Sequence, residues 1–170
     1  MTVDPSVYRT RAASILAAAA VLLLGAGLSA AAESPFAGLS GNWSGTGTVT
    51  YASGTTEHLS CRVKYDRNSD QASEDSVQQT LRCASDSYKF QINAYYRNQA
   101  GTVTGHWDEL VLDIHGSITG SVTAGKITGN LHGPTFLASV LVDTRGNEQT
   151  VTISAEDKDI RQVSVAVRRK

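Results

Sequence analysis

The alternation of apolar and polar residues along most of the chain is the feature that most restricts its fold. Leu59, Cys61, Val63 and Tyr65 alternate with polar or charged residues, and the same rhythm recurs over residues 88–96. Successive side chains of a strand point to opposite faces, so such runs bury one face and expose the other. No stretch after residue 33 shows the period of an amphipathic helix. The pattern therefore predicts an all-β domain.

Turn-forming residues interrupt the alternating runs about every 8–12 residues, which divides the chain into short strands. The predicted strands cover residues 42–51, 56–65, 77–83, 87–96, 102–114, 117–123, 126–132, 135–142, 148–155 and 160–168. We predict a single antiparallel β-barrel of about 8–10 strands, with a β-sandwich as the alternative. A period of two does not separate these two architectures.

A five-residue step recurs in the chain: an apolar residue, a hydroxyl, a glycine, a polar residue and an apolar residue. The copies are Leu39–Trp43, Val103–Trp107, Ile118–Val122 and Ile127–Leu131. Each glycine has the same parity as its two apolar neighbours, so it faces the core. Glycine at such a position permits a sharp bend or the close approach of another group. We interpret the repeat as a device that curves the sheet toward closure.

Two cysteines, Cys61 and Cys83, are the whole cysteine content of the chain. If residues 65 and 79 pair across the longest loop, residues 66–76, then the cysteines lie opposite each other on neighbouring strands. Directly opposed residues are close enough for a disulfide. We predict this bridge, with a stabilisation of about 3 kcal/mol in the chain-entropy model.

The N-terminal segment has the pattern of an export signal. Arg9 and Arg11 precede an apolar run over residues 15–28, and small residues follow at 30–32. The run is shorter than the ~20 residues that span a bilayer. We expect a secretory signal peptide over residues 1–32.

The expected domain then covers residues 33–170, in the periplasm or outside the cell, with no membrane span after cleavage. The formal net charge of the chain is −1. With so little net charge and no visible basic stripe, the sequence does not indicate a nucleic-acid partner.

Residues 106–115 contain the densest group of side chains able to do chemistry. His106 and Asp108 share one face of an unbroken strand, and Asp113 and His115 share the opposite face. A bulge would be needed to gather all four into a metal site, so we expect a solvated strand face with charges at the end of a hairpin. There is no Gly-x-Ser-x-Gly elbow for a nucleophile. The sequence thus predicts no catalytic residue, no metal ligand and no cofactor, and we expect a protein that is not an enzyme.

Trp43 and Trp107 are the candidate ligand-binding residues. Each follows a hydroxyl-Gly-x step and has the inward parity. They either fill the core or line a lumen that holds an apolar or planar ligand.

The opening Leu39–Trp43 resembles the Gly-x-Trp start of lipocalins and the similar start of avidins, a resemblance that implies a calycin-type barrel. With two tryptophans, no biotin-binding residue is carried over from avidins, and no clear helix matches that of lipocalins. The Gly-Asn-Trp opening and the cysteine spacing are also similar to small periplasmic metalloprotease inhibitors. As a whole, residues 36–169 resemble an uncharacterised family of small secreted alphaproteobacterial proteins, which implies compartment and domain limits only.

These features together predict an exported, non-enzymatic binding protein for a small apolar or amphipathic ligand. The alternative is a protease-inhibitor-like or other protein-interaction module that acts on a protein partner through exposed loops, such as residues 66–76.

Overall fold

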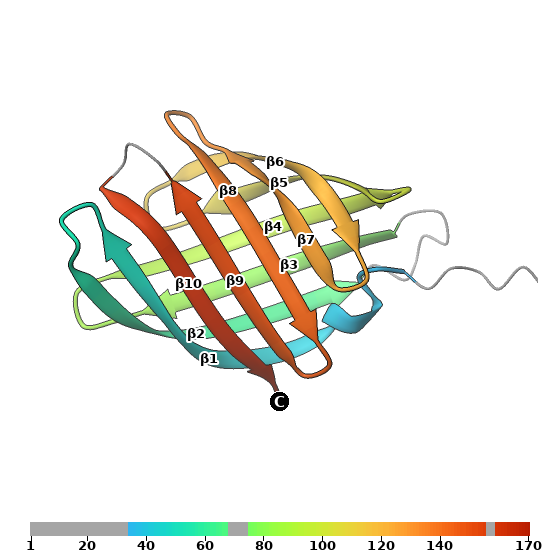
Figure 1. The fold of residues 1–170 in the computed structure, drawn as a ribbon, viewed down its shortest axis with the longest axis horizontal. Coiled ribbons are helices and arrows are strands. Elements are labelled where there is room, and N and C mark those ends of the chain that lie inside the picture. Colours follow the sequence, from blue (N-terminus) through green and yellow to red (C-terminus); the bar gives the residue numbers. More distant parts are fainter. Residues whose placement is uncertain (1–33, 68–74, 156–158) are drawn as a thin grey trace, which may run out of the picture. The chain divides into compact units, whose positions relative to one another are not determined.

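The computed structural model describes residues 34–67, 75–155 and 159–170. In this part of the chain ten antiparallel strands form one closed barrel (Figure 1). The strands are β1 (Gly41–Tyr51), β2 (Thr56–Arg67), β3 (Asp75–Ala84), β4 (Lys89–Gln99), β5 (Thr102–Glu109), β6 (Ile114–Thr123), β7 (Lys126–His132), β8 (Leu137–Arg145), β9 (Glu148–Ala155) and β10 (Ile160–Arg169). Each strand pairs with the next along the chain, and β10 pairs with β1.

This closed sheet confirms the predicted barrel, and it removes the β-sandwich alternative. The predicted signal peptide, residues 1–32, lies outside the described residues. Within the described part, no helix is long and apolar enough to span a membrane.

One strand prediction is wrong. The strand predicted over 102–114 ends at Glu109, and a turn over residues 110–113 leads into β6. The apolar residues Leu110–Leu112 favour a strand when the sequence is considered alone. The Glu109 carboxylate instead accepts hydrogen bonds from the backbone N–H groups of Val111 and Leu112, at 3.0 and 2.6 Å. The chain reverses there rather than at residues 115–116.

The predicted disulfide is confirmed. Cys61 pairs with Cys83 across β2 and β3, and Tyr65 pairs with Gln79, as the loop argument required. The two cysteine Cα atoms are 4.2 Å apart, and the sulfurs are bonded. Both side chains face the barrel interior.

The inward glycines mark places where neighbouring strands come very close. Gly120 and Gly129 are direct partners on β6 and β7. A Cβ at Gly120 would lie 2.2 Å from the carbonyl oxygen of Thr128. Gly105 is equally tight against the Tyr95 carbonyl, at 2.0 Å. Three copies of the repeat therefore occur where a side chain has no room.

The first copy of the repeat differs. Gly41 begins β1 with a φ of 120° and has no atom within 4 Å of a Cβ at that position. Its role is a backbone conformation that L-residues rarely adopt. The close approach in β1 occurs at Gly45, where a Cβ would lie 2.0 Å from the Ala166 carbonyl oxygen.

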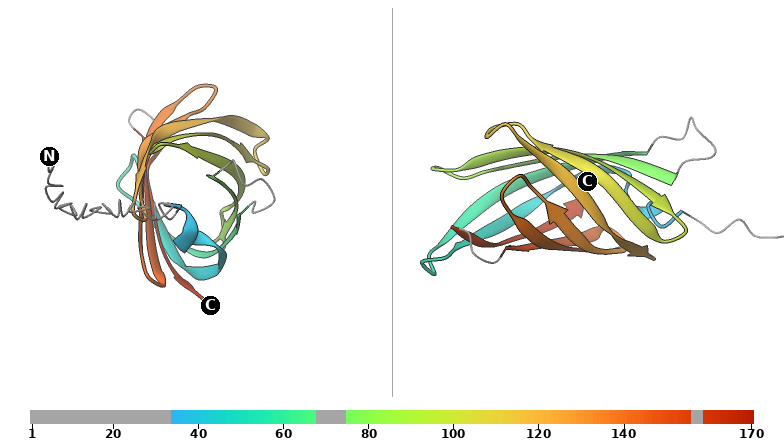
Figure 2. Two further views of the ribbon diagram at one scale, coloured as in Figure 1. Left: turned by 90° about the vertical axis from the view of Figure 1, so that its right-hand side faces the viewer. Right: turned by 90° about the horizontal axis from the view of Figure 1, so that it is seen from above.

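One end of the barrel is closed by the segment that precedes β1. Phe36 is fully buried, and the 3₁₀ turn η1 (Ala37–Leu39) buries Leu39. In the left view of Figure 2, η1 lies within the ring of strands at the near end. The Trp43 indole Nε1 donates to the Leu39 carbonyl at 2.8 Å, so the turn is attached to β1.

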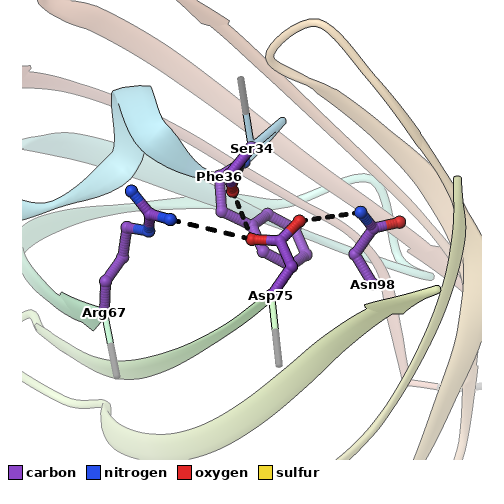
Figure 3. Close-up of polar contacts among 5 residues, drawn as sticks. All are labelled: Ser34, Phe36, Arg67, Asp75 and Asn98. Carbon is purple, nitrogen blue, oxygen red and sulfur yellow. Dashed lines mark hydrogen bonds and ion pairs between the residues drawn. The ribbon is translucent and has the colours of Figure 1, made fainter. Parts of the chain in front are cut away.

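The Asp75 carboxylate fastens this segment to β2, β3 and β4 (Figure 3). It accepts hydrogen bonds from the Ser34 hydroxyl and from the Asn98 amide, the latter at 2.7 Å. Arg67 lies 3.9 Å from the same carboxylate. Phe36 is thus held in place as the plug of this end.

Candidate functional site

Between the plugged end and the opposite end, the inward side chains leave a cavity of about 390 Å³ inside the barrel. Its wall is mostly apolar and comes from strands all around the ring. Examples are Leu81, Phe90, Ile118, Ile127, Val140 and Val151. Small-molecule sites in proteins commonly measure ~300–1,000 Å³ and are mainly apolar with a few polar groups. The cavity is within this range.

The floor of the cavity is a chain of hydrogen-bonded polar side chains. The Tyr96 hydroxyl donates to the Gln79 amide oxygen, and the Gln79 amide nitrogen donates to the Tyr65 hydroxyl at 3.3 Å. Tyr65 in turn donates to Gln149 at 2.8 Å, and Gln149 donates to the Thr144 hydroxyl at 2.9 Å. Tyr65, Gln79 and Tyr96 also border the cavity. The floor therefore offers amide and phenol groups to an occupant.

Burial extends the pH range over which the phenol groups of this floor are uncharged. It raises the pKa of the Tyr65 and Tyr96 hydroxyls well above the usual value for tyrosine, because desolvation disfavours the charged phenolate. Both groups are therefore neutral hydrogen-bonding groups at physiological pH and in moderately alkaline solution.

Trp107 lies in the wall toward the opposite end, called the mouth here. Its ring packs against Phe136 with the centroids 5.8 Å apart, and its Nε1 donates to the Ser117 carbonyl at 3.2 Å. A Cβ at Gly116 would come within 2.6 Å of the indole ring. Glycine at this position therefore gives the tryptophan its space.

Among the described residues, two acidic ones border the cavity, Glu109 and Asp159. Glu109 is only 6% exposed, and its carboxylate also accepts a hydrogen bond from the Gln91 N–H at 2.8 Å. The neighbouring Tyr88 has a raised pKa, mainly because of burial and then because of the negative charge of Glu109. Among the described lining residues there is no lysine, arginine or histidine.

The turn between β5 and β6 forms part of the mouth. Leu112 borders the cavity although 60% of its surface is exposed. Its neighbours Leu110 and Val111 are also exposed, at 51% and 44%. An apolar residue that contacts both the cavity and the solvent places the opening at this end.

The two tryptophans predicted from the sequence have different surroundings. Trp107 borders the cavity, as a ligand-binding residue would. Trp43 is 1% exposed and does not border it. Its ring meets Tyr65 edge-on and lies under the Arg169 guanidinium, 4.6 Å from the ring centroid. Trp43 thus packs in the plugged end of the barrel.

The polar group at residues 106–115 lies on the outside and in the turn. His106 stacks on Tyr95, with ring centroids 5.5 Å apart, and Asp108 is opposite His115 on the outer face. Asp113 is in the turn, with a φ of 53°. In the part of the chain that the structure describes, no three His, Cys, Asp or Glu side chains form a group suited to a metal ion.

The polar floor of the cavity was not predicted from the sequence. Gln79 has the inward parity of Val77 and Leu81, and Gln149 has that of Val151. A polar residue at an apolar parity position was the available signal. The apolar residues around Gln79 and Gln149 are sufficient to define each strand, so the strand assignment did not depend on either glutamine.

No protein-family model and no curated protein sequence matches the chain. Among solved structures, the chain is similar to the crystal structure of Rv2717c from M. tuberculosis, with a TM-score of 0.63 and 15% identity over 79% of this chain and 94% of that one. It is also similar to the S-type phycobiliprotein lyase CPES from Guillardia theta, with a TM-score of 0.53 and 9% identity over 79% and 90% of the two chains. At these identities the likeness is one of fold alone.

Proposed function

We propose that this protein is a non-enzymatic carrier that holds one small apolar or amphipathic molecule inside its barrel. The apolar cavity of about 390 Å³ is the observation that carries the proposal. Well-packed protein interiors contain few voids larger than a water molecule. A cavity of this size, with polar groups at its floor and an apolar residue at its mouth, fits a binding site better than a packing defect.

The charges of the cavity favour a neutral or cationic occupant. The charged residues among its described lining, Glu109 and Asp159, are both acidic. An anionic head group such as a carboxylate would meet no cation among the described lining residues, so its desolvation would go uncompensated by them. The amide of Gln79 and the hydroxyl of Tyr96 suit an uncharged hydroxyl, carbonyl or amide group on the ligand.

Two fluorescent probes that share one scaffold test this proposal. N-phenyl-1-naphthylamine is neutral, and 8-anilinonaphthalene-1-sulfonate adds a sulfonate to the same rings. We expect saturable one-to-one binding of the neutral probe and much weaker binding of the sulfonate. If neither probe binds, and native mass spectrometry of the protein as purified also shows no small-molecule adduct, the carrier proposal is wrong.

A pair of tryptophan substitutions on β8 locates the binding. Val140 faces the cavity and is 8% exposed, whereas the next residue, Leu141, faces outward and is 39% exposed. Val140→Trp should fill the cavity and abolish probe binding. Leu141→Trp adds the same ring to the outside and should bind as the wild type does. Equal binding by both variants would place the probe elsewhere.

The proposal includes export to the periplasm or beyond. It is supported by the Cys61–Cys83 disulfide, since such bonds persist mainly in oxidising compartments. Edman sequencing of the protein recovered from the periplasm should begin close to residue 33. Recovery of the uncleaved chain in the cytoplasm would contradict it.

A further inference from the structure

The outer face of β1 to β4 holds a second concave surface that the carrier proposal does not use. This hollow measures about 1080 Å³ and is open to solvent. Among the residues that the structure describes, those lining it include five cations, namely Arg62, Lys64, Arg82, Lys89 and Lys170, and no acidic residue. The whole chain has a formal net charge of −1, so this concentration of cations is local. We call this surface the basic groove.

Arg62 and Arg82 both line the basic groove and face each other directly across β2 and β3. Like charges that are directly opposed destabilise a sheet. Their other direct partners are the neutral Ser44 on β1 and Gln91 on β4. The same strand registers show that the diagonal neighbours of the two arginines on this face are also neutral or cationic. On β3, for example, Thr80 and Ala84 lie diagonal to Arg62.

Ion pairs between described residues leave most of these cations uncompensated. In the described part of the chain, Lys64 pairs with Asp66 at 2.8 Å, and both side chains are more than half exposed. Arg62, Arg82 and Lys89 take part in no ion pair between described residues. A concave surface with unpaired guanidinium groups is complementary to an anionic partner.

We propose that the basic groove binds an extended, carboxylate-rich segment of a partner protein. Guanidinium groups bind carboxylates in a planar, two-bonded geometry that specifies direction as well as charge. One end of the groove is formed by Val111, which is 44% exposed and adjoins the exposed Leu110. A peptide carries aliphatic side chains for this end as well as carboxylates, whereas an acidic polysaccharide lacks the aliphatic groups.

The shape of the site excludes other modes of recognition. The described barrel is closed, so a partner strand finds no free sheet edge to extend. A bilayer surface is flat, and it would follow a hollow lined by Arg62 and Arg82 less closely than a narrow chain would. A narrow chain enters the hollow and contacts both arginines.

The arginine pair gives a test that separates binding from folding. Arg82→Glu replaces the like-charged pair by an opposite-charged cross-strand pair with Arg62, so the melting temperature should stay the same or rise. The same change should weaken binding of the acidic segment at least about tenfold, because it sets a carboxylate against a carboxylate. Arg161→Glu, on β10 and outside the groove, makes the same change in net charge and is the control.

The probe is a synthetic peptide in which glutamate alternates with serine and which ends in two leucines, labelled with fluorescein. We expect the full wild-type protein and Arg161→Glu to bind it, and Arg82→Glu to lose binding while still binding N-phenyl-1-naphthylamine. The same peptide with glutamine for glutamate should not bind. The inference is overturned if Arg82→Glu binds the acidic peptide as tightly as wild type does. It is also overturned if Arg161→Glu loses as much affinity, or if phosphatidylglycerol vesicles bind to the groove and the peptide does not.

Discussion

Replacing Gly120 by alanine tests how the barrel is curved. A Cβ at this position would lie 2.2 Å from the Thr128 carbonyl oxygen, whereas ordinary contacts begin near 3.4 Å. The backbones of β6 and β7 must therefore separate by more than about 1 Å, or the sheet must bend elsewhere. Overpacking of this kind costs ~1–3 kcal/mol. This cost is partly offset, because alanine is more favourable than glycine in a strand by ~0.5–1 kcal/mol.

The net expectation is a loss of about 1–2 kcal/mol in the free energy of unfolding, measured by urea titration with circular dichroism. For a domain of this size it corresponds to a fall of roughly 3–8 °C in melting temperature. Gly38→Ala is the matched control, because nothing lies within 4 Å of its Cβ position and its φ is not in the left-handed region. That variant should change stability by less than about 0.5 kcal/mol.

A second substitution shows whether strand separation is the cause. Gly129 is the direct partner of Gly120, and a Cβ there would lie 2.3 Å from the Thr119 carbonyl oxygen. Once one alanine has pushed the strands apart, the second should cost less than it does alone. Additive costs, or a Gly120→Ala variant as stable as Gly38→Ala, would refute the close-approach explanation of the repeat.

Three further outcomes are expected of the stability of the barrel. Replacing Cys61 and Cys83 together by serine should lower the free energy of unfolding by about 3 kcal/mol, the value expected when a disulfide closes a loop of 22 residues. Reduction of the wild-type disulfide should lower the urea midpoint to that of this variant. Burial raises the pKa of Tyr65 and Tyr96, so their contribution to the free energy of unfolding is complete below their unfolded-state pKa of ~10 and declines as the pH rises above it. The urea midpoint should therefore fall above about pH 10. The fall should be smaller when both tyrosines are replaced by phenylalanine. Glu109→Gln removes the charge that three backbone N–H groups share and should destabilise by about 1–3 kcal/mol; a variant with the wild-type midpoint would show that the turn forms without it.

The strands and the disulfide were predictable because a period of two and the spacing of two cysteines have direct geometric consequences. The register of β2 and β3 followed from the loop between them, and it places Cys61 opposite Cys83. Closure into a barrel was favoured by the inward glycines, whose close contacts at Gly105 and Gly120 the structure shows.

The cavity was harder to predict from the sequence than the strands and the disulfide were. Inward parity predicts that Trp107 faces the interior, where it borders the cavity, but it predicts the same for Trp43, since parity does not tell which end of the barrel a residue occupies. The size of the cavity depends on how ten strands coil around one another, a property of the whole ring that no local pattern contains. The turn after Glu109 was missed because its apolar sequence resembles a strand and one buried carboxylate forms it.

The pairing of β1 with β10 has a consequence for when the protein can fold. The hydrogen bonds that close the ring join residues near 43 to residues near 169, and the Lys170 N–H reaches the Asn42 carbonyl at 3.0 Å. Contacts between such distant residues form slowly, and ribosomal synthesis supplies β10 last. Until residues 160–169 are available, β1 and β9 each present an unpaired edge of the kind that drives aggregation. The nascent chain therefore depends on protection of its first strand until its last strand has been made.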